Sequence, residues 1–451
     1  MLSVVIGLVW LAGVVSAASA PIVLPLFAKP RHEHRYSTVS VTTTSSSSKA
    51  IAPQGTYYLS GCPQYDFSAN LVIGGQTLAV IVDTGSSTTA VASNMCHNCP
   101  GVPAVYTVSS TAVNQQEQVF EQFLGGSGWA ALVYSDLVHF PGLPSFRMNF
   151  GAIVVQSGGF FSDNPCVNQP AGITYDGILG MGYPGAAVGT TDALWTVMNS
   201  SGILDHNLFA ILLCEDVGIL WFSSYDTNYT VPNAITQYAP ITTDTIYGVD
   251  LNDMLVNNVS LGFGPSSFGT AYVDSGTTVL VLPPLVYTAF VKSLNNNTAF
   301  TTYFGHNYWS LGLCQTANPV LNTSALNDIL PPITFKLGGG ATLTLKAISS
   351  YLVEVPFNGR VFYCPGAVDS GSSKTQYTIL GWSVMNQFTT IFDIENTRIG
   401  FVPITVDACA KAFNASGASP FISAATSYNE QNLAYAGMFS LILFCLCSWL
   451  F

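Results

Sequence analysis

Two short motifs hold the residues best suited to chemistry. Asp83 begins the segment Asp-Thr-Gly-Ser, and Asp274 begins the segment Asp-Ser-Gly-Thr. Each aspartate ends an apolar run, where burial makes an ionised carboxylate costly unless a partner compensates. Two carboxyls that face each other cannot both ionise freely, so one keeps a proton while the other is charged. Such a pair can act as acid and base on a bound water molecule.

The residues that follow each aspartate suit the support of such a pair. Gly85 and Gly276 allow a sharp backbone turn and the close approach of a ligand. Hydroxyl side chains occur in both motifs, at Thr84, Ser86, Ser275 and Thr277. We expect the first hydroxyl of each motif to tie the two loops together. The second can hydrogen-bond its own carboxylate and orient it.

The two motifs belong to an internal repeat. AVIVDTGSS is followed by DGILGMGYP in the first half, and TAYVDSGTT is followed by YTILGWSVM in the second half. Each half therefore has an apolar strand that ends in the motif, and an Ile-Leu-Gly roughly 100 residues later. Self-similarity at this long period predicts two related lobes. An approximate two-fold axis between them would bring Asp83 and Asp274 face to face, which two unrelated turn aspartates would not do.

Short apolar or alternating runs between Gly, Pro and Asn turns predict a mostly β core. The clearest are LAVIVD, WAALVYSDLVHF, FAILLC, GILWFS, AYVDSG, VLVLP, ITFKL, ATLTLKA and TIFDI. Helical patterns are few and short, around residues 193–200 and 284–294. The fold class predicted from these runs is all-β.

Composition excludes several classes of protein. The chain has 451 residues, of which 49% are hydrophobic and 8% charged, so it can bury a large core and is not a disordered chain. Its net charge of −12 argues against nucleic acid as a partner, because binding phosphates needs clustered basic side chains. An acidic protein also keeps less negative charge at low pH, which suits an acidic compartment.

The N-terminal segment resembles a secretory signal. Residues 1–20 contain an apolar run and end in Ala18-Ser19-Ala20, which has the form of a cleavage site. A transmembrane anchor is the alternative, although the run is short for a span. Residues 21–52 form a basic, Ser/Thr-rich leader without periodicity. Glycosylation sequons agree with secretion and begin at Asn199, Asn228, Asn258, Asn296, Asn322 and Asn414.

The C-terminal tail predicts attachment to a membrane. Residues 433–451 carry no charge, and no basic residue follows them. A transmembrane helix that faces the cytosol usually has flanking Lys or Arg. Residues 411–432 form a linker that offers the small, polar sequence of a glycosylphosphatidylinositol (GPI) signal, at Ser423-Ala424-Ala425 or Ser416-Gly417-Ala418. We expect a GPI anchor, with a C-terminal span as the alternative.

The segments VDTGSS, DGILGMGYP, VDSGTT and ILGWSVMNQFTTIFDIENTRIGFVP resemble the pepsin-type aspartic proteases, and the resemblance covers residues 57–409. It implies a bilobal all-β fold, with lobes at residues 53–240 and 241–410 and a cleft between them. It also implies a monomeric endopeptidase that needs no metal or other cofactor and acts on polypeptides, with Gly85 and Gly276 contacting the substrate.

Sharing of one proton by the aspartates predicts that the protease activity has its optimum below about pH 6. A silent peptide-binding protein on the same fold is the alternative, although neither aspartate nor motif glycine is lost.

Within that family, the chain is most similar to beta-secretase. Ala90 stands where pepsin-like members carry Trp, and VDSGTTVLVLPPLVYTAFVKSL and Cys214 also resemble beta-secretase. The family's flap hairpin, which closes over substrate, carries Tyr-x-x-Gly-Ser, whereas this chain has Phe123-Leu124-Gly125-Gly126-Ser127. We expect Phe123 and Trp129 to contact substrate, with Trp129 supplying bulk in the flap. An ordinary strand aromatic is the alternative for Phe123.

Eight of the ten cysteines lie between Cys62 and Cys409, which predicts four disulfides in an oxidising compartment. Cys96–Cys99 is expected to be a structural disulfide, with a redox or metal site as the alternative. Cys314–Cys364 resembles the family's bridge in the C-terminal lobe, and Cys214–Cys409 resembles a bridge of beta-secretase. Cys62–Cys166 follows only by elimination. Cys445 and Cys447 lie in the apolar tail.

The leader also resembles the family's prosegment, in which an apolar Pro-Leu stretch precedes a lysine. In IVLPLFAKPRHEHR that lysine is Lys29. A lysine docked between two carboxylates would favour the ionised pair and block the water site until acid loosened the contact. A disordered leader with incidental basic residues is the alternative.

Overall fold

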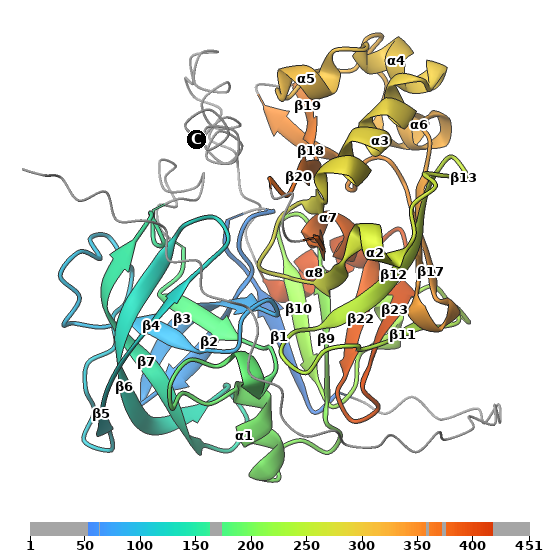
Figure 1. Ribbon diagram of the computed structural model, residues 1–451. Helices are drawn as coiled ribbons and strands as arrows, with labels where there is room; N and C mark the ends of the chain where they lie inside the picture. Colours follow the sequence, from blue (N-terminus) through green and yellow to red (C-terminus); the bar gives the residue numbers. More distant parts are fainter. Residues whose placement is uncertain (1–52, 63, 163–173, 358–359, 372–375, 418–451) are drawn as a thin grey trace, which may run out of the picture. The chain divides into compact units, whose positions relative to one another are not determined.

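The computed structural model describes residues 53–62, 64–162, 174–357, 360–371 and 376–417 (Figure 1). The expected signal peptide, the leader with Lys29, the apolar tail and Cys166 lie outside these ranges. Within them, strands dominate and helices are short, so the all-β class is confirmed. None of the described helices is long and apolar enough to cross a membrane.

The first half of the chain forms a seven-stranded sheet in the order β2-β3-β8-β4-β7-β6-β5. Its strands are β2 (Ser68–Ile73), β3 (Gln76–Asp83), β4 (Ala90–Ala92), β5 (Val113–Gln122), β6 (Gly128–His139), β7 (Phe146–Ser157) and β8 (Gly177–Gly180). β3 pairs in parallel with β8, and Asp83 lies opposite Gly180. The apolar strand that ends in Asp83 is therefore fixed beside the Ile-Leu-Gly strand of the same half.

The second half repeats this arrangement. Its eight-stranded sheet has the order β17-β16-β12-β14-β21-β15-β20, with β13 paired to β12. The strands are β12 (Gly248–Val256), β13 (Val259–Ser260), β14 (Thr270–Val273), β15 (Leu280–Leu282), β16 (Ile333–Leu337), β17 (Thr342–Leu345), β20 (Ala367–Asp369) and β21 (Tyr377–Leu380). β14 pairs in parallel with β21, as β3 does with β8. Two related halves were predicted from the repeat, and the strand pairing agrees.

A six-stranded sheet joins the two halves in the order β1-β10-β9-β22-β23-β11. Its strands are β1 (Gly55–Leu59), β9 (Leu208–Leu213), β10 (Gly218–Phe222), β11 (Gln237–Pro240), β22 (Phe388–Asp393) and β23 (Arg398–Pro403). Figure 1 shows green β9 and β10 beside red β22 and β23. The seam is the antiparallel β9–β22 pair, where Phe209 lies opposite Phe392 and the rings stack with centroids 4.6 Å apart.

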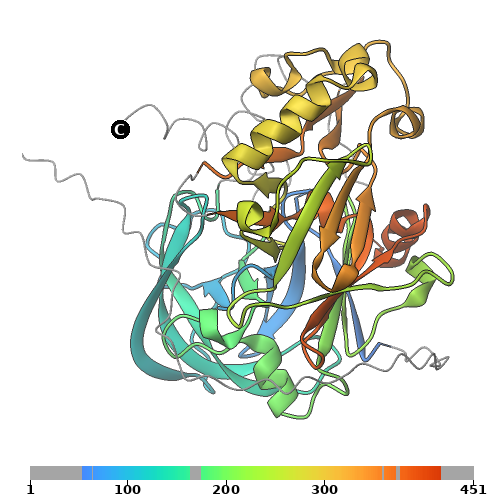
Figure 2. The same ribbon diagram turned by 45° about the vertical axis from the view of Figure 1, so that its right-hand side comes forward.

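The helices cover the sheets. They are α1 (Leu194–Ser200), α2 (Pro265–Phe268), α3 (Pro284–Asn295), α4 (Thr298–Phe304), α5 (Tyr308–Leu311), α6 (Thr323–Ile329), α7 (Trp382–Met385) and α8 (Ala408–Ser416). The expected α1 and α3 are present. The yellow helical segment lies at one end of the second half (Figure 2). α8 includes the first residues of the expected linker, because Ala408 and Ala412 are buried and hold that helix against the joining sheet.

Short 3₁₀ turns and one hairpin complete the fold. The turns are η1 (Pro184–Ala186), η2 (Thr227–Tyr229) and η3 (Gly338–Gly340), and the hairpin pairs β18 (Leu352–Phe357) with β19 (Arg360–Pro365). Phe290 of α3 and Phe300 of α4 pack on Tyr351, which precedes β18. Tyr308 of α5 packs on Phe300 and extends this cluster. Burial of these rings explains why several short helices form where the sequence pattern predicts only α3.

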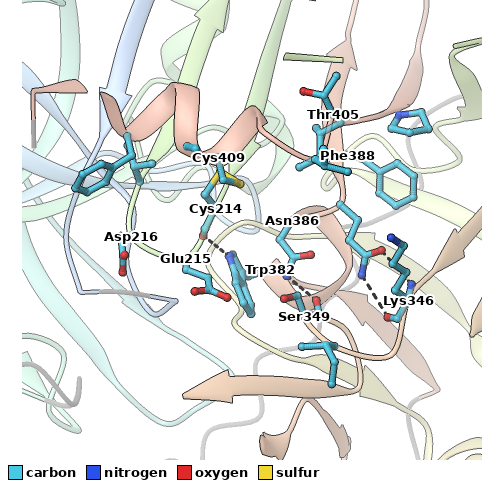
Figure 3. Close-up of a pocket in the computed structure, with 18 of the residues that line it drawn as sticks. Cys214, Glu215, Asp216, Lys346, Ser349, Trp382, Asn386, Phe388, Thr405 and Cys409 are labelled. Atoms are coloured by element: carbon cyan, nitrogen blue, oxygen red, sulfur yellow. Dashed lines mark hydrogen bonds between the residues drawn. A yellow bond between two sulfur atoms is a disulfide. The ribbon is translucent and has the colours of Figure 1, made fainter. Parts of the chain in front are cut away.

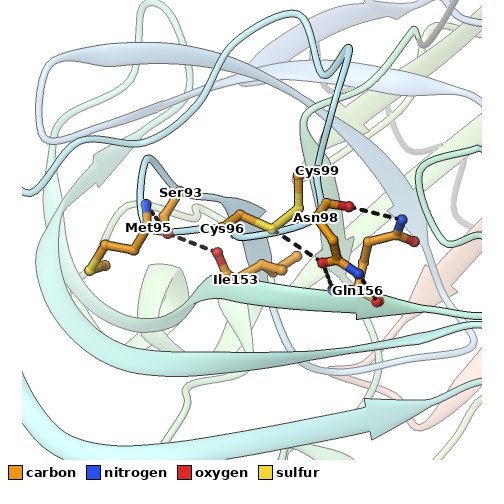
Figure 4. The surroundings of a disulfide bond; sticks show 7 residues. All are labelled: Ser93, Met95, Cys96, Asn98, Cys99, Ile153 and Gln156. Carbon is orange, nitrogen blue, oxygen red and sulfur yellow. Dashed lines mark hydrogen bonds between the residues drawn. A yellow bond between two sulfur atoms is a disulfide. The ribbon is translucent and has the colours of Figure 1, made fainter.

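Three expected disulfides are confirmed: Cys96–Cys99, Cys214–Cys409 and Cys314–Cys364. Cys62–Cys166 stays a prediction because Cys166 lies outside the described residues. Around Cys96–Cys99, Asn98 exchanges hydrogen bonds with the backbone and side chain of Gln156 on β7 (Figure 4). No group of three or more potential metal ligands occurs in the described part of the chain. The hydrogen bonds of Asn98 attach the Cys96–Cys99 loop to β7.

Phe209→Ala should lower the free energy of unfolding by about 3–5 kcal/mol, because it removes a buried ring from the seam between the halves. Phe120→Ala is the matched control. Phe120 is 59% exposed on β5, so its loss should change stability by less than about 0.5 kcal/mol. Urea denaturation followed by tryptophan fluorescence measures both. Equal losses in the two variants would contradict the importance of the seam.

Candidate active site

Asp83 is the last residue of β3, and its carboxylate is held by its own loop. The amide of Gly85 donates to Oδ1 at 2.9 Å, and the hydroxyl of Ser86 donates to Oδ2. The carbonyl of Asp83 accepts from the amide of Met181 after β8. The Met181 contact ties the end of β3 to the end of β8, so the parallel pairing of these strands fixes the backbone that carries the carboxyl group.

Asp274 directly follows β14 and has a matching environment. The amide of Gly276 donates to its Oδ1 at 2.8 Å, and the hydroxyl of Thr277 donates to its Oδ2 at 2.6 Å. The amide of Asp274 donates to the carbonyl of Leu380 on β21. Ser86 and Thr277 thus make the carboxylate contacts that the sequence predicts for them. Each carboxylate has one hydroxyl and one amide donor, which is the arrangement expected from the repeat.

Thr84 and Ser275 join the two loops through a reciprocal set of hydrogen bonds. The Thr84 hydroxyl donates to the carbonyl of Val273 and accepts from the amide of Ser275, both at 2.9 Å. The Ser275 hydroxyl donates to the carbonyl of Val82 at 2.7 Å and accepts from the amide of Thr84 at 3.1 Å. Both residues are buried. The predicted tie between the loops is therefore present in the structure.

The motif glycines make room for the opposite carboxyl group. A Cβ atom on Gly85 would lie 2.6 Å from Cγ of Asp274, and one on Gly276 would lie 2.4 Å from Oδ1 of Asp83. Both distances are far below van der Waals contact, so any larger residue would push the two aspartates apart. The sequence suggests that these glycines allow a ligand to approach. The structure shows that they also leave room for the carboxyl group of the opposite aspartate.

The pair has the electrostatics of two carboxyls that share a site. Burial raises the pKa of Asp83, and the charge of Asp274 raises it further, while hydrogen bonds from Ser86 and Gly85 act in the opposite direction. Asp274 is only half-buried and Gly276 is exposed, so the pair is open to solvent on the Asp274 side. Such a pair can keep a proton on one carboxyl and hold the other as an acceptor.

The β5–β6 hairpin carries the two expected flap aromatics. Phe123 lies at its turn, where its amide donates to the carbonyl of Ser127, and its ring stacks on Phe160 with centroids 5.7 Å apart. Trp129 on β6 is buried among small residues, with its ring 3.6 Å from the position of a Cβ on Gly151. Ala90 belongs to the same cluster. The large side chain of Trp129 therefore packs in the same cluster as the small side chain of Ala90.

Sequence reasoning missed Glu121, on the same hairpin. Val119, Glu121 and Phe123 alternate along one face, and Glu121 lies opposite Trp129 in the strand register. Burial raises the pKa of Glu121 to about 8, with a further contribution from the charge of Asp83. The signal was available in the sequence, because an acidic residue between two inward apolar residues is unusual on a strand.

A separate cavity of about 590 Å³ lies beside the joining sheet (Figure 3). Its walls include the Cys214–Cys409 disulfide and Trp382, whose indole nitrogen donates to the carbonyl of Cys214 at 2.8 Å. Glu215 also lines it, and burial together with the charges of Glu354 and Asp216 raises the pKa of Glu215 to about 7. None of the catalytic, supporting or substrate-contacting residues expected from the sequence lines this cavity.

Comparison with known proteins identifies relatives across most of the chain. The profile of the eukaryotic aspartyl proteases matches residues 66–404. An aspartic protease of Phaffia rhodozyma is 27% identical over 349 residues, which cover 73% of this chain and 74% of that protein. A beta-secretase of Strongylocentrotus purpuratus is 27% identical over 384 residues, 78% and 68% of the two chains. Pepsin A of Gallus gallus is 26% identical over 355 residues, 76% and 82% of the two chains.

The raised pKa values predict that the protein is more stable in acid. Burial raises the pKa of Asp66 to about 6, of Glu215 to about 7 and of Glu121 to about 8, and it also raises that of Asp83. Between about pH 4 and these values, the folded protein holds protons that the unfolded chain has lost. Stability therefore falls as pH rises through this window. The lowered pKa of Asp136 acts only below about pH 4, so it does not change this trend.

Differential scanning calorimetry should give a higher Tm at about pH 5 than at about pH 8. Glu121→Gln should reduce this difference, because it removes one of the carboxyls responsible. Glu117→Gln is the control, since it removes the same charge from a half-buried position on the same strand. A Tm that stays constant or rises over the interval, or equal effects of the two variants, would contradict the explanation.

Proposed function

The chain belongs to the eukaryotic aspartyl protease family, and from this we propose that it hydrolyses peptide bonds of polypeptides with Asp83 and Asp274 as its catalytic pair. The observation that carries the proposal is the mutual arrangement of the two aspartates. Their motif glycines face the opposite carboxyl group, and the charge of Asp274 raises the pKa of Asp83. A pair that shares a proton in this way can supply both an acid and a base.

In the proposed reaction, the ionised carboxylate of Asp274 accepts a proton from a water molecule whose oxygen attacks the substrate carbonyl carbon. Asp83, whose proton is favoured by burial, donates that proton to the carbonyl oxygen. The resulting diol collapses when Asp274 donates its new proton to the amide nitrogen, Asp83 takes a proton back from a diol hydroxyl, and the carbon–nitrogen bond breaks. This releases a carboxylic acid and an amine and restores the starting protonation of the pair. Ser86 and Thr277 orient the carboxylates throughout, since their hydroxyls donate to the outer oxygens. The need for one shared proton places the optimum in acid.

Asp83→Asn and Asp274→Asn should each reduce kcat/KM by about a thousandfold or more, because each removes a protonation state that the pair requires. Cleavage of an unfolded protein at about pH 4, with and without a pepstatin-type inhibitor, measures the loss. Asp205→Asn is the control, since Asp205 is exposed and lies outside the pair. Circular dichroism establishes that the variants fold. A folded single variant with near wild-type turnover would contradict the assignment.

We also propose that the protein matures in the secretory pathway and is held at a membrane, at the cell surface or in an endolysosomal compartment. Its disulfides suit an oxidising compartment. The asparagines of all six sequons are exposed, so each is accessible to glycosylation: Asn199, Asn228, Asn258, Asn296, Asn322 and Asn414. The uncharged residues 433–451 supply the membrane attachment, and small residues near Ser423 suit a GPI site.

Phosphatidylinositol-specific phospholipase should release the protein from intact cells into the medium. A GPI-anchored chain has lost its apolar tail, so cleavage of the lipid removes the remaining attachment. Immunoblotting of medium and membranes measures the release, and a chain truncated before residue 433 is the control that should be soluble without treatment. Mass spectrometry of the mature C-terminus distinguishes a GPI anchor from a retained apolar tail. A chain that ends at Phe451 would show that the tail is retained as a membrane segment.

A further inference from the structure

We propose that Glu121 forms a subsite for a basic side chain of the substrate, Lys or Arg, next to the bond that is cleaved. This inference rests on the proposed function, because it assumes that a polypeptide lies along the aspartate pair. It goes further by assigning a preference among substrates to one residue. Glu121 does not belong to either aspartate motif or to their hydroxyl contacts.

The position of Glu121 follows from the β5–β6 hairpin. Along β5, the side chains of Val119 and Glu121 point to one face while Phe120 points to the other and is exposed. Val119 and Phe123 pack on one hydrophobic cluster, which also contains Trp129 and Phe160. Glu121 lies between them, so its carboxyl group is presented from a largely apolar wall.

That wall adjoins the aspartate pair. Ile81, two residues before Asp83 on β3, packs against the same cluster. Because alternate residues of a strand share a face, Ile81 and Asp83 project to the same side of the sheet. Glu121 is close enough to Asp83 for the charge of that aspartate to act on it. A substrate side chain beside the cleaved bond would therefore reach both the apolar cluster and Glu121.

The carboxyl group of Glu121 has an unmet capacity for hydrogen bonding. Its Oε2 atom is buried and accepts no hydrogen bond from the described residues, and the indole nitrogen of the paired Trp129 is likewise buried without a described partner. Buried polar groups are rarely left in this condition, since each costs free energy until a partner satisfies it. A ligand that brings donors to this position would be favoured.

The charge at this position identifies the kind of donor. None of the ion pairs formed among the described residues includes Glu121, and the charged group that acts on it is another carboxyl, Asp83. A Lys or Arg side chain brings both hydrogen-bond donors and a compensating positive charge. Its aliphatic stem can pack along Phe123 and Phe160, as such stems do on apolar surfaces. An acidic side chain would bring no compensating charge.

Ionisation of Glu121 depends on what occupies the subsite. The raised pKa of Glu121 keeps its carboxyl protonated in the empty site through the acidic range. A bound cation favours the carboxylate, so the ion pair forms with release of that proton, and the preference for basic side chains should strengthen as pH rises. Asp83 on β3 is the charged group that acts on Glu121, and Asp274 in turn acts on Asp83. The other titratable groups are Tyr175 in the adjoining apolar cluster and Glu117 on β5 itself.

The test measures kcat/KM for peptides that differ only at the residues flanking the cleaved bond, which are Lys, Arg, norleucine or Glu. The wild-type enzyme should prefer Lys or Arg over norleucine at one of the two flanking positions by about 10- to 100-fold, the range for a hydrogen bond to a charged group. Glu121→Gln should lower this ratio about tenfold, mainly through KM, and Glu121→Lys should favour Glu instead. Glu117→Gln, on the same strand, should keep the wild-type ratio.

A second measurement does not depend on any variant. The inhibition constant of a pepstatin-type compound for the wild-type enzyme should fall about tenfold when the norleucine side chain beside the compound's central hydroxyl is replaced by lysine. This fall should be larger at about pH 6 than at about pH 4. Cleavage of norleucine peptides without any preference for Lys or Arg would overturn the inference and leave the proposed function intact. Failure to cleave any peptide would overturn both.

Discussion

The hydrogen bonds between Thr84 and Ser275 are the constraint on which the site depends. They join loops that are 191 residues apart in sequence, and both side chains are buried. Each hydroxyl both donates to and accepts from the opposite loop, so no other rotamer would satisfy both partners. This rigid junction keeps two carboxyls together in spite of their repulsion. The glycines at residues 85 and 276 are required for the same reason, since a Cβ atom on either would collide with the opposite aspartate.

The rest of the fold supplies the rigidity that this junction needs. Parallel pairs β3–β8 and β14–β21 fix the strand ends, and the six-stranded sheet joins the halves through stacked Phe209 and Phe392. Burial then sets the chemistry. It raises the pKa of Asp83 and of Glu121 together, so that the site collects protons in a range where isolated carboxyls would have lost them. An enzyme built in this way is suited to acid both in stability and in the protonation of its site.

Much of this organisation could be predicted from the sequence because a repeated motif carries it. Asp83 and Asp274 end apolar strands, and their hydroxyl neighbours make the contacts expected of them. Glu121 was missed because β5 has the sequence VNQQEQVFEQ, whose polar residues hide the alternation that turns one carboxyl inward. The helices between residues 298 and 329 were missed for a related reason, since they are too short for a helical period and depend on aromatic packing. Cys214–Cys409 and Cys314–Cys364 were predictable from resemblance, whereas Cys96–Cys99 was predictable from its short spacing and the expected oxidising compartment.

The claim at the centre of this account is that Asp83 and Asp274 share one proton across the junction of the two halves. Neutron diffraction from crystals grown in deuterated buffer at about pH 5 locates such a proton directly. The account predicts a single deuteron on the pair, bound to Asp83 and directed toward Asp274, with the oxygens that accept from Ser86 and Thr277 unprotonated. Two deuterons, none, or carboxyl groups too far apart to share one would contradict it.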